Sequence, residues 1–166
     1  MLTGSGNAVV DLKDNAPGPA AVRITGNPES HHFGVRALGS EDDLVVTLRP
    51  YHGIRPLDWS GAKSTGFEVT ATGPWRIEVL PLSAVPRFST SFKGKGDAVV
   101  QFAGDGSLAK ITGNDTRQYF YVGAFGPQGT ESLVNTTEPY SGSCQISREA
   151  EFFEVRAIGS WTITIE

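Results

Sequence analysis

The sequence lacks several residue types and patterns, and each shortage excludes a class of protein. Cys144 is the only cysteine in 166 residues, so the monomer can form no internal disulfide. No apolar run approaches the length of a membrane-spanning helix, so we expect no membrane insertion. The 14 basic residues nearly balance the 18 acidic ones. Because no basic patch stands out, we expect no nucleic-acid partner and no anionic-membrane partner.

A signal peptide is also missing from the start of the chain, where Met1–Gly4 carries neither a basic region nor an apolar one. A cytoplasmic protein, a trimmed one, or one that travels as part of a larger assembly would each fit this start. The compartment therefore stays open at this point.

Helical periodicity is absent, because no window of ten residues repeats apolar side chains at spacings of three and four. Short alternating runs such as 76–79 and 162–165 have instead the period of strands with one buried face. Gly73-Pro74 and Gly159-Ser160 stand where the chain should reverse, so we predict that each half ends in a hairpin with an inward Trp. Other strands are predicted near 8–12, 20–25, 32–37, 44–48, 54–59, 98–102, 108–112, 119–124, 133–137 and 144–147.

The chain repeats itself at an interval of 86 to 90 residues, which is the size of a small domain. Three matched strings are Gly4–Val10 with Gly94–Val100, Ile24–Asn27 with Ile111–Asn114, and Pro50–Gly53 with Pro139–Gly142. Phe67–Val69 likewise matches Phe153–Val155, and Trp75 matches Trp161. The copies differ in segments predicted as loops, of which the proline-rich segment 15–19 and the insertion 58–63 belong to the first copy alone. Length changes confined to loops leave the strands of a sandwich intact.

These patterns together predict an all-β protein of two homologous domains in tandem. Regular strand spacing with intervening Gly, Pro and Asn is typical of small β-sandwiches of jelly-roll type. We place the first domain at residues 1–85 and the second at 86–166, with Ser83–Pro86 as a short linker. Approximate twofold pseudosymmetry between the copies is expected.

The second copy resembles the small β-sandwich repeats that occur alone or in tandem in bacterial lipoproteins and extracellular proteins. The resemblance is carried by Leu133–Thr136, Pro139-Tyr140, Gly142, Phe153–Val155, Ala157, Gly159–Trp161 and Ile163. The first copy departs from it, with Val46 in place of Asn135 and Pro74 in place of Ser160. The resemblance implies the fold and favours an extracellular or cell-surface location, and it implies no activity.

Candidate catalytic and metal-binding motifs each fail a physical requirement. Ser60 and Lys63 have the Ser-x-x-Lys spacing of serine acyltransferases, but that chemistry needs both on one helical turn and this segment is a loop insertion. His31-His32 would point to opposite faces of a strand, with no third ligand at metal spacing. The acidic run 41–43 and Asp105 lack the oxygen density of a calcium site, although calcium binding stays open. We predict no catalytic residue, no metal and no cofactor.

Aromatic side chains are the remaining functional lead. Trp75 and Trp161 match across the copies and are predicted to lie in the core, while Tyr51 and Tyr140 are assigned to structural turns. Unmatched aromatic rings can stack on sugars or anchor a protein interface. The predicted ligand-binding residues are Trp59, Tyr119 and Tyr121, together with Asp58 and Lys63 as hydrogen-bonding neighbours of Trp59.

The sequence thus favours a non-catalytic binding module with a carbohydrate or another cell-envelope ligand. A structural, assembly or adhesion protein that acts through protein contacts is the alternative. Neither the ligand nor the oligomeric state follows from the sequence.

Overall fold

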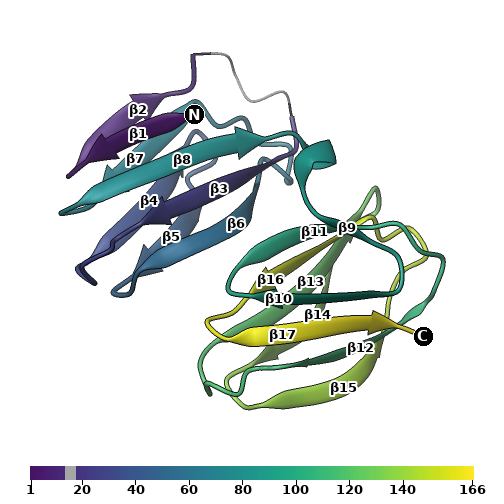
Figure 1. Ribbon diagram of the computed structural model, residues 1–166. Coiled ribbons are helices and arrows are strands. Elements are labelled where there is room, and N and C mark those ends of the chain that lie inside the picture. Colours follow the sequence, from purple (N-terminus) through teal and green to yellow (C-terminus); the bar gives the residue numbers. More distant parts are fainter. Residues whose placement is uncertain (14–17) are drawn as a thin grey trace. The chain divides into compact units, whose positions relative to one another are not determined.

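The computed structural model describes residues 1–13 and 18–166 and is built from β-strands (Figure 1). This confirms the predicted all-β class. The chain divides into two compact units, Met1–Ala84 and Val85–Glu166. A single turn of 3-10 helix, η1 (Leu82–Ala84), ends the first unit. Residues 14–17, which include part of the proline-rich segment 15–19 predicted as a loop, lie outside the described residues.

Unit 1 contains two antiparallel sheets of four strands each, ordered β1-β8-β3-β6 and β2-β7-β4-β5. Its strands are β1 (Leu2–Ser5), β2 (Ala8–Asp11), β3 (Ala20–Gly26), β4 (Phe33–Leu38), β5 (Asp43–Thr47), β6 (Tyr51–Leu57), β7 (Gly66–Thr70) and β8 (Pro74–Leu80).

Unit 2 contains a four-stranded sheet ordered β10-β17-β12-β15 and a five-stranded sheet ordered β14-β13-β16-β11-β9. Its strands are β9 (Arg87–Phe88), β10 (Ser91–Lys95), β11 (Ala98–Phe102), β12 (Leu108–Gly113), β13 (Phe120–Gly126), β14 (Gly129–Thr136), β15 (Tyr140–Gln145), β16 (Phe152–Arg156) and β17 (Ser160–Ile165). The short strand β9 pairs with β11 in parallel, whereas the other pairs are antiparallel. Apart from β9, the strand order of each sheet is that of a sheet in unit 1, with every strand number raised by nine.

The hairpins predicted at the end of each copy are wrong. β7 and β8 belong to different sheets, and so do β16 and β17. The turns around Gly73 and Gly159 therefore carry the chain from one sheet to the other. Alternation of buried and exposed residues gives each strand an inner face, but it does not say whether consecutive strands pair.

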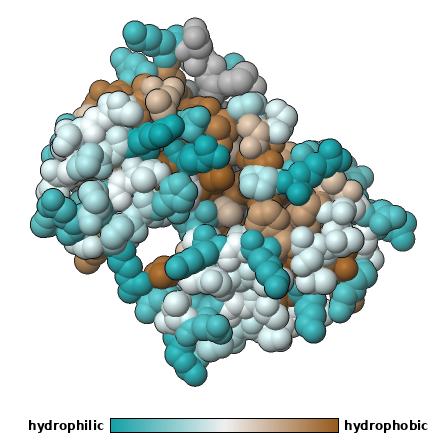
Figure 2. Space-filling view, viewed as in Figure 1, coloured by the Kyte–Doolittle hydropathy of each residue, from teal (hydrophilic) through white to brown (hydrophobic). Residues whose placement is uncertain are grey.

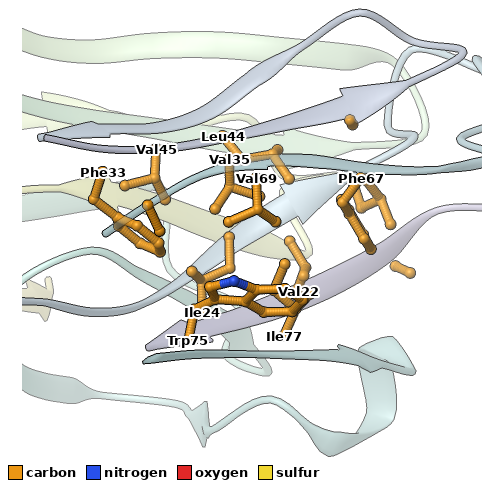
Figure 3. Close-up of a cluster of buried hydrophobic side chains, with 14 residues drawn as sticks. Val22, Ile24, Phe33, Val35, Leu44, Val45, Phe67, Val69, Trp75 and Ile77 are labelled. Carbon is orange, nitrogen blue, oxygen red and sulfur yellow. The ribbon is translucent and has the colours of Figure 1, made fainter. Parts of the chain in front are cut away.

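The core of unit 1 takes its side chains from both of its sheets (Figure 3). Trp75 and Ile77 come from β8, while Phe67 and Val69 come from β7 in the other sheet. The core of unit 2 likewise joins Trp161 of β17 with residues of β13 and β16. Trp75 and Trp161 are 4% and 2% exposed, which confirms their prediction as core residues.

Each core tryptophan is held by the same two contacts with an edge strand. The indole N–H of Trp75 donates a hydrogen bond to the carbonyl oxygen of Gly6, and that of Trp161 to the carbonyl oxygen of Gly96, both at 2.9 Å. The six-membered ring lies directly over a glycine, because a Cβ atom on Gly4 would come within 3.0 Å of three ring atoms. Glycine is therefore required by close packing at this position of β1 and, for the same reason, in β10.

The loop after β3 is fixed by the buried side chain of Asn27, which has a positive φ of 62°. Its amide group donates to the carbonyl oxygens of His31 and Arg49, and its Oδ1 accepts from the N–H of His31. One side chain thus ties the loop after β3 to the loop before β6. Asn114 in unit 2 makes the same set of bonds with Gln118 and Glu138.

Polar and intermediate residues make up most of the surface visible in Figure 2. Within the residues that the structure describes, no helix is both long and apolar enough to cross a membrane.

Candidate functional site

Two adjoining depressions lie on unit 1, and together they form what we call the β3–β6–β8 groove. One has a volume of about 490 Å³ and the other of about 350 Å³. Thr25, His52 and Arg76 line both depressions, so the two adjoin along these side chains. The larger depression is also lined by Gly26, Pro28, Pro50, Tyr51, Pro74 and Trp75, and the smaller one by Arg23 and Glu78.

Strand alternation explains why polar side chains gather on this face of the sheet. Ile24 and Ile77 point into the core, so their neighbours Thr25 and Arg76 point to the opposite face. The register then aligns them, because Thr25 faces both His52 on β6 and Arg76 on β8. Thr3 on β1 faces Arg76 in turn. The result is a polar row across four strands, about 14 Å long at the usual strand spacing of about 4.8 Å.

The second row of the groove contains an ion pair. Arg23 on β3 faces Glu78 on β8, and its Nη1 lies 3.0 Å from the Glu78 carboxylate. Both side chains are part-exposed, so the ion pair contributes little to the stability of the fold. Its effect on the groove is that the positive charge of Arg23 offsets the negative charge of Glu78.

The opposite end of the groove is apolar and rigid. Pro28 and Pro50 lie in the two loops that Asn27 joins, and Pro74 begins β8. Tyr51, at the start of β6, is part-exposed beside them and packs partly against the core, and the buried Trp75 also lines the depression. Proline fixes its own φ, so this wall is preformed and loses little entropy when a ligand binds.

The charge in the groove is biased to positive. Two arginines and His52 stand against the single carboxylate of Glu78. The Nδ1 atom of His52 lies 2.8 Å from the hydroxyl oxygen of Thr25, which fixes the ring against β3. Over the described ranges 1–13 and 18–166, Arg76 makes no side-chain hydrogen bond and no ion pair, and its side chain is exposed. Its five N–H donors are therefore directed to solvent.

Unit 2 has a depression of about 410 Å³ at the same strand positions. Its Tyr140 and Trp161 correspond to Tyr51 and Trp75. The variable lining differs in chemistry, since Asp115, Ser141, Ser160 and Thr162 replace Pro28, His52, Pro74 and Arg76. The depression itself therefore holds no cation, although Lys93 and Lys110 lie on the same sheet outside it.

The structure places Asp58, Trp59 and Lys63 together in the loop between β6 and β7. Asp58 is buried, and its carboxylate accepts hydrogen bonds from the N–H and the hydroxyl of Ser64. Trp59 is part-exposed, and its indole N–H donates to the carbonyl oxygen of Ala20. Lys63 is exposed. Asp58 thus holds the loop in shape, which leaves the Trp59 ring and Lys63 as the groups that could meet a ligand.

That loop and the groove lie at opposite ends of the same strand. Tyr51 starts β6, whereas Trp59 follows its last residue, Leu57. Six residue steps of about 3.3 Å separate the two ends by about 20 Å, so one sugar unit cannot touch both. Ser60 lies in a turn and Lys63 in irregular backbone after it, so the two do not share the helical turn that Ser-x-x-Lys chemistry needs.

Tyr119 and Tyr121 lie together in unit 2, before and at the start of β13. Tyr119 is 47% exposed. The guanidinium of Arg156 lies 5.3 Å from the centre of the Tyr121 ring and donates through Nε to Glu154. Burial raises the pKa of the Tyr121 hydroxyl, the Glu154 carboxylate raises it further, and Arg156 opposes them. This pair forms a second aromatic surface.

His31 and His32 precede β4 and are both exposed, and His31 pairs with Glu29 at 3.6 Å. Wherever the structure describes the chain, no three His, Cys, Asp or Glu side chains gather as metal ligands would.

Sequence reasoning missed the groove residues His52, Arg76 and Thr25, and it assigned Tyr51 to a turn that is in fact the first residue of β6. The sequence did contain one signal for the groove. Within otherwise similar stretches the first copy has His52 and Pro74 where the second has Ser141 and Ser160, and both His52 and Pro74 line this groove.

No protein-family model matches this chain, and the comparison with curated proteins found no match.

Proposed function

We propose that this chain is a non-catalytic binding module built from two homologous β-sandwich domains, and that its ligand is a glycan. The sandwich is supported by the sharing of one core between the two sheets of each unit. Descent from one ancestral domain is supported by the common strand order and by the matched Trp75 and Trp161 contacts. A relationship to the repeats of bacterial lipoproteins and extracellular proteins is part of the same proposal.

The observation that carries the proposed function is the amphipathic lining of the β3–β6–β8 groove. An apolar wall of Tyr51 and three prolines stands beside a polar row of Thr25, His52 and Arg76. A sugar ring has the matching character, with an apolar C–H face and a rim of hydroxyl groups. The exposed edge of Tyr51 can stack on the C–H face while the row hydrogen-bonds the hydroxyls.

The groove is better suited to binding than to catalysis. Among the described residues that line it, Glu78 is the one carboxylate and is engaged by Arg23, whereas glycoside hydrolysis uses a pair of carboxyl groups across the bond. An open groove of this kind offers a polar ligand little buried area, so the affinity for each site should be modest.

The test is a binding screen against soluble and insoluble polysaccharides with four proteins. These are the wild type, Tyr51→Leu, Tyr140→Leu as the matched change in unit 2, and Trp59→Ala for the loop between β6 and β7. Leucine keeps apolar bulk but loses the flat ring, so Tyr51→Leu should weaken binding by about fivefold. Circular dichroism checks that each variant is folded.

Each outcome of the screen has a defined meaning. Loss in Tyr51→Leu with retention in the other variants supports the groove. Loss in Trp59→Ala alone assigns binding to the loop predicted from the sequence. Absence of binding to every glycan rejects the glycan proposal.

An assembly role is the second candidate, and the edge strand β5 favours it. β5 ends its sheet, and Val46 and the following Leu48 are 68% and 67% exposed. Unpaired edges with exposed apolar side chains are templates for pairing with another chain. Sedimentation velocity over a range of concentrations tests this role, and Val46→Lys should abolish any association found.

A further inference from the structure

The position and surroundings of Arg76 indicate which glycan the groove of unit 1 takes. We propose that the β3–β6–β8 groove recognises a sugar that carries a carboxylate, with Arg76 as the group that binds it. This inference deepens the proposed glycan-binding function and rests on it.

The first argument is that Arg76 is exposed and uncommitted at the centre of the groove. It lines both depressions, and in the described part of the chain it makes no side-chain hydrogen bond or ion pair. The other arginine of the groove, Arg23, is engaged by Glu78. A planar guanidinium presents paired N–H donors that match a carboxylate, and such charge-assisted bonds are stronger than those to a neutral hydroxyl.

The second argument is the arrangement around Arg76. Thr25 lies next to it on β3 and Thr3 next to it on β1, so hydroxyl groups flank the cation on both sides. His52 adds a ring beyond Thr25 that carries positive charge when protonated. The apolar wall of Tyr51 begins where the polar row ends. A uronic acid unit has each matching part, namely a carboxylate, hydroxyl groups and an apolar ring face.

The third argument comes from the corresponding depression of unit 2. Thr162 and Ser141 stand there in place of Arg76 and His52, and Asp115 lines the depression. A carboxylate would meet no cation inside that depression and would be repelled by Asp115. The two units therefore differ in where the cation stands: Arg76 lies inside the depression of unit 1, whereas Lys93, which faces Thr162, and Lys110 lie on the sheet of unit 2 outside its depression.

The decisive measurement compares polygalacturonate with its methyl-esterified form, which has the same sugar backbone without the negative charge. Isothermal titration calorimetry is carried out on the wild type, Arg76→Thr, Glu78→Gln and Arg148→Thr. Arg76→Thr installs the residue that unit 2 has at this position. Arg148→Thr removes the same charge from an exposed turn of unit 2 and serves as the control.

Wild type should bind polygalacturonate about tenfold more tightly than the ester, and Arg76→Thr should remove most of that difference. Glu78→Gln should tighten polygalacturonate binding by about threefold, because it removes a repulsive carboxylate from the groove. Arg148→Thr should change neither affinity by more than about twofold, since its charge lies outside the groove. All three changes are at exposed or part-exposed side chains, so the fold should be retained.

Three results would overturn the inference. Equal binding of the acid and the ester by wild type would leave glycan binding standing while removing the carboxylate preference. Equal losses in Arg76→Thr and Arg148→Thr would show diffuse attraction with no site at Arg76. Absence of binding to both polymers and to every glycan of the screen would remove the proposed function itself.

Discussion

Replacing Gly4 with alanine should destabilise unit 1 through its contact with Trp75. The new Cβ atom would lie within 3.0 Å of Cζ2, Cε2 and Cη2 of the indole, which is closer than such atoms approach in folded proteins. Trp75 cannot retreat freely, because it is 4% exposed and its N–H is bound to the carbonyl oxygen of Gly6.

The cost follows from the two ways in which the clash can be relieved. If the surrounding core shifts, overpacking costs about 1–3 kcal/mol. If the ring moves and the hydrogen bond is lost, a buried donor is left unsatisfied at a further cost of about 1–3 kcal/mol. We therefore expect Gly4→Ala to lower the free energy of unfolding by about 1–3 kcal/mol if only the core shifts, and by about 2–6 kcal/mol if the hydrogen bond is lost as well.

Urea unfolding followed by circular dichroism measures this loss, and Gly73→Ala is the matched control. A Cβ atom on Gly73 would meet only Pro28, at an ordinary contact distance of 3.9 Å, so the control should be close to neutral. Combining Gly4→Ala with Trp75→Phe removes the ring atoms that clash, so the double variant should lose less than the sum of the two single changes. Equal effects of Gly4→Ala and Gly73→Ala, or strict additivity in the double variant, would refute the packing argument.

Three further predictions follow from single residues. Trp75→Ala and Trp161→Ala should each cost about 3–5 kcal/mol in denaturant melts, whereas Trp59→Ala, at a part-exposed ring, should cost clearly less. Burial and a neighbouring carboxylate raise the pKa of Tyr121 in the folded state. The neutral hydroxyl therefore contributes fully to the free energy of unfolding below about pH 10, the usual tyrosine pKa, and this contribution is lost as pH rises through the folded-state pKa. Absorbance titration should show Tyr121→Phe removing a tyrosine signal that ionises later than an ordinary tyrosine, and an unchanged curve would contradict this. Cys144 should titrate as one thiol per unfolded chain, and a melting temperature that changes with reductant would reveal an unforeseen intermolecular disulfide.

Sequence patterns were sufficient for the strands that have one clearly apolar face. Trp75 and Ile77 alternate with charged residues on β8, and both are buried as predicted. The edge strands β1 and β10 were not predicted, because their Gly4 and Gly94 reduce strand propensity when read locally. Only the three-dimensional contact with a tryptophan ring explains why glycine stands there.

The groove was harder to predict because it depends on register between strands far apart in the sequence. Thr25, His52 and Arg76 come from three strands and are neighbours only through pairing. Sequence reasoning favoured loop aromatics such as Trp59, since unmatched residues in an insertion are visible without a fold. Pairing partners carry no comparable local signal.

The buried asparagines of the two units also imply unequal chemical ageing. Asparagine deamidates when the backbone nitrogen of the next residue attacks the side-chain amide, which requires that nitrogen to carry a hydrogen. Asn27 precedes proline, which has none, whereas Asn114 precedes Asp115 and remains open to the reaction. Conversion of Asn114 to aspartate would replace an amide that donates to two carbonyl oxygens with a carboxylate that both would repel. The corresponding loop of unit 2 would then open first during prolonged storage, while that of unit 1 would keep its shape.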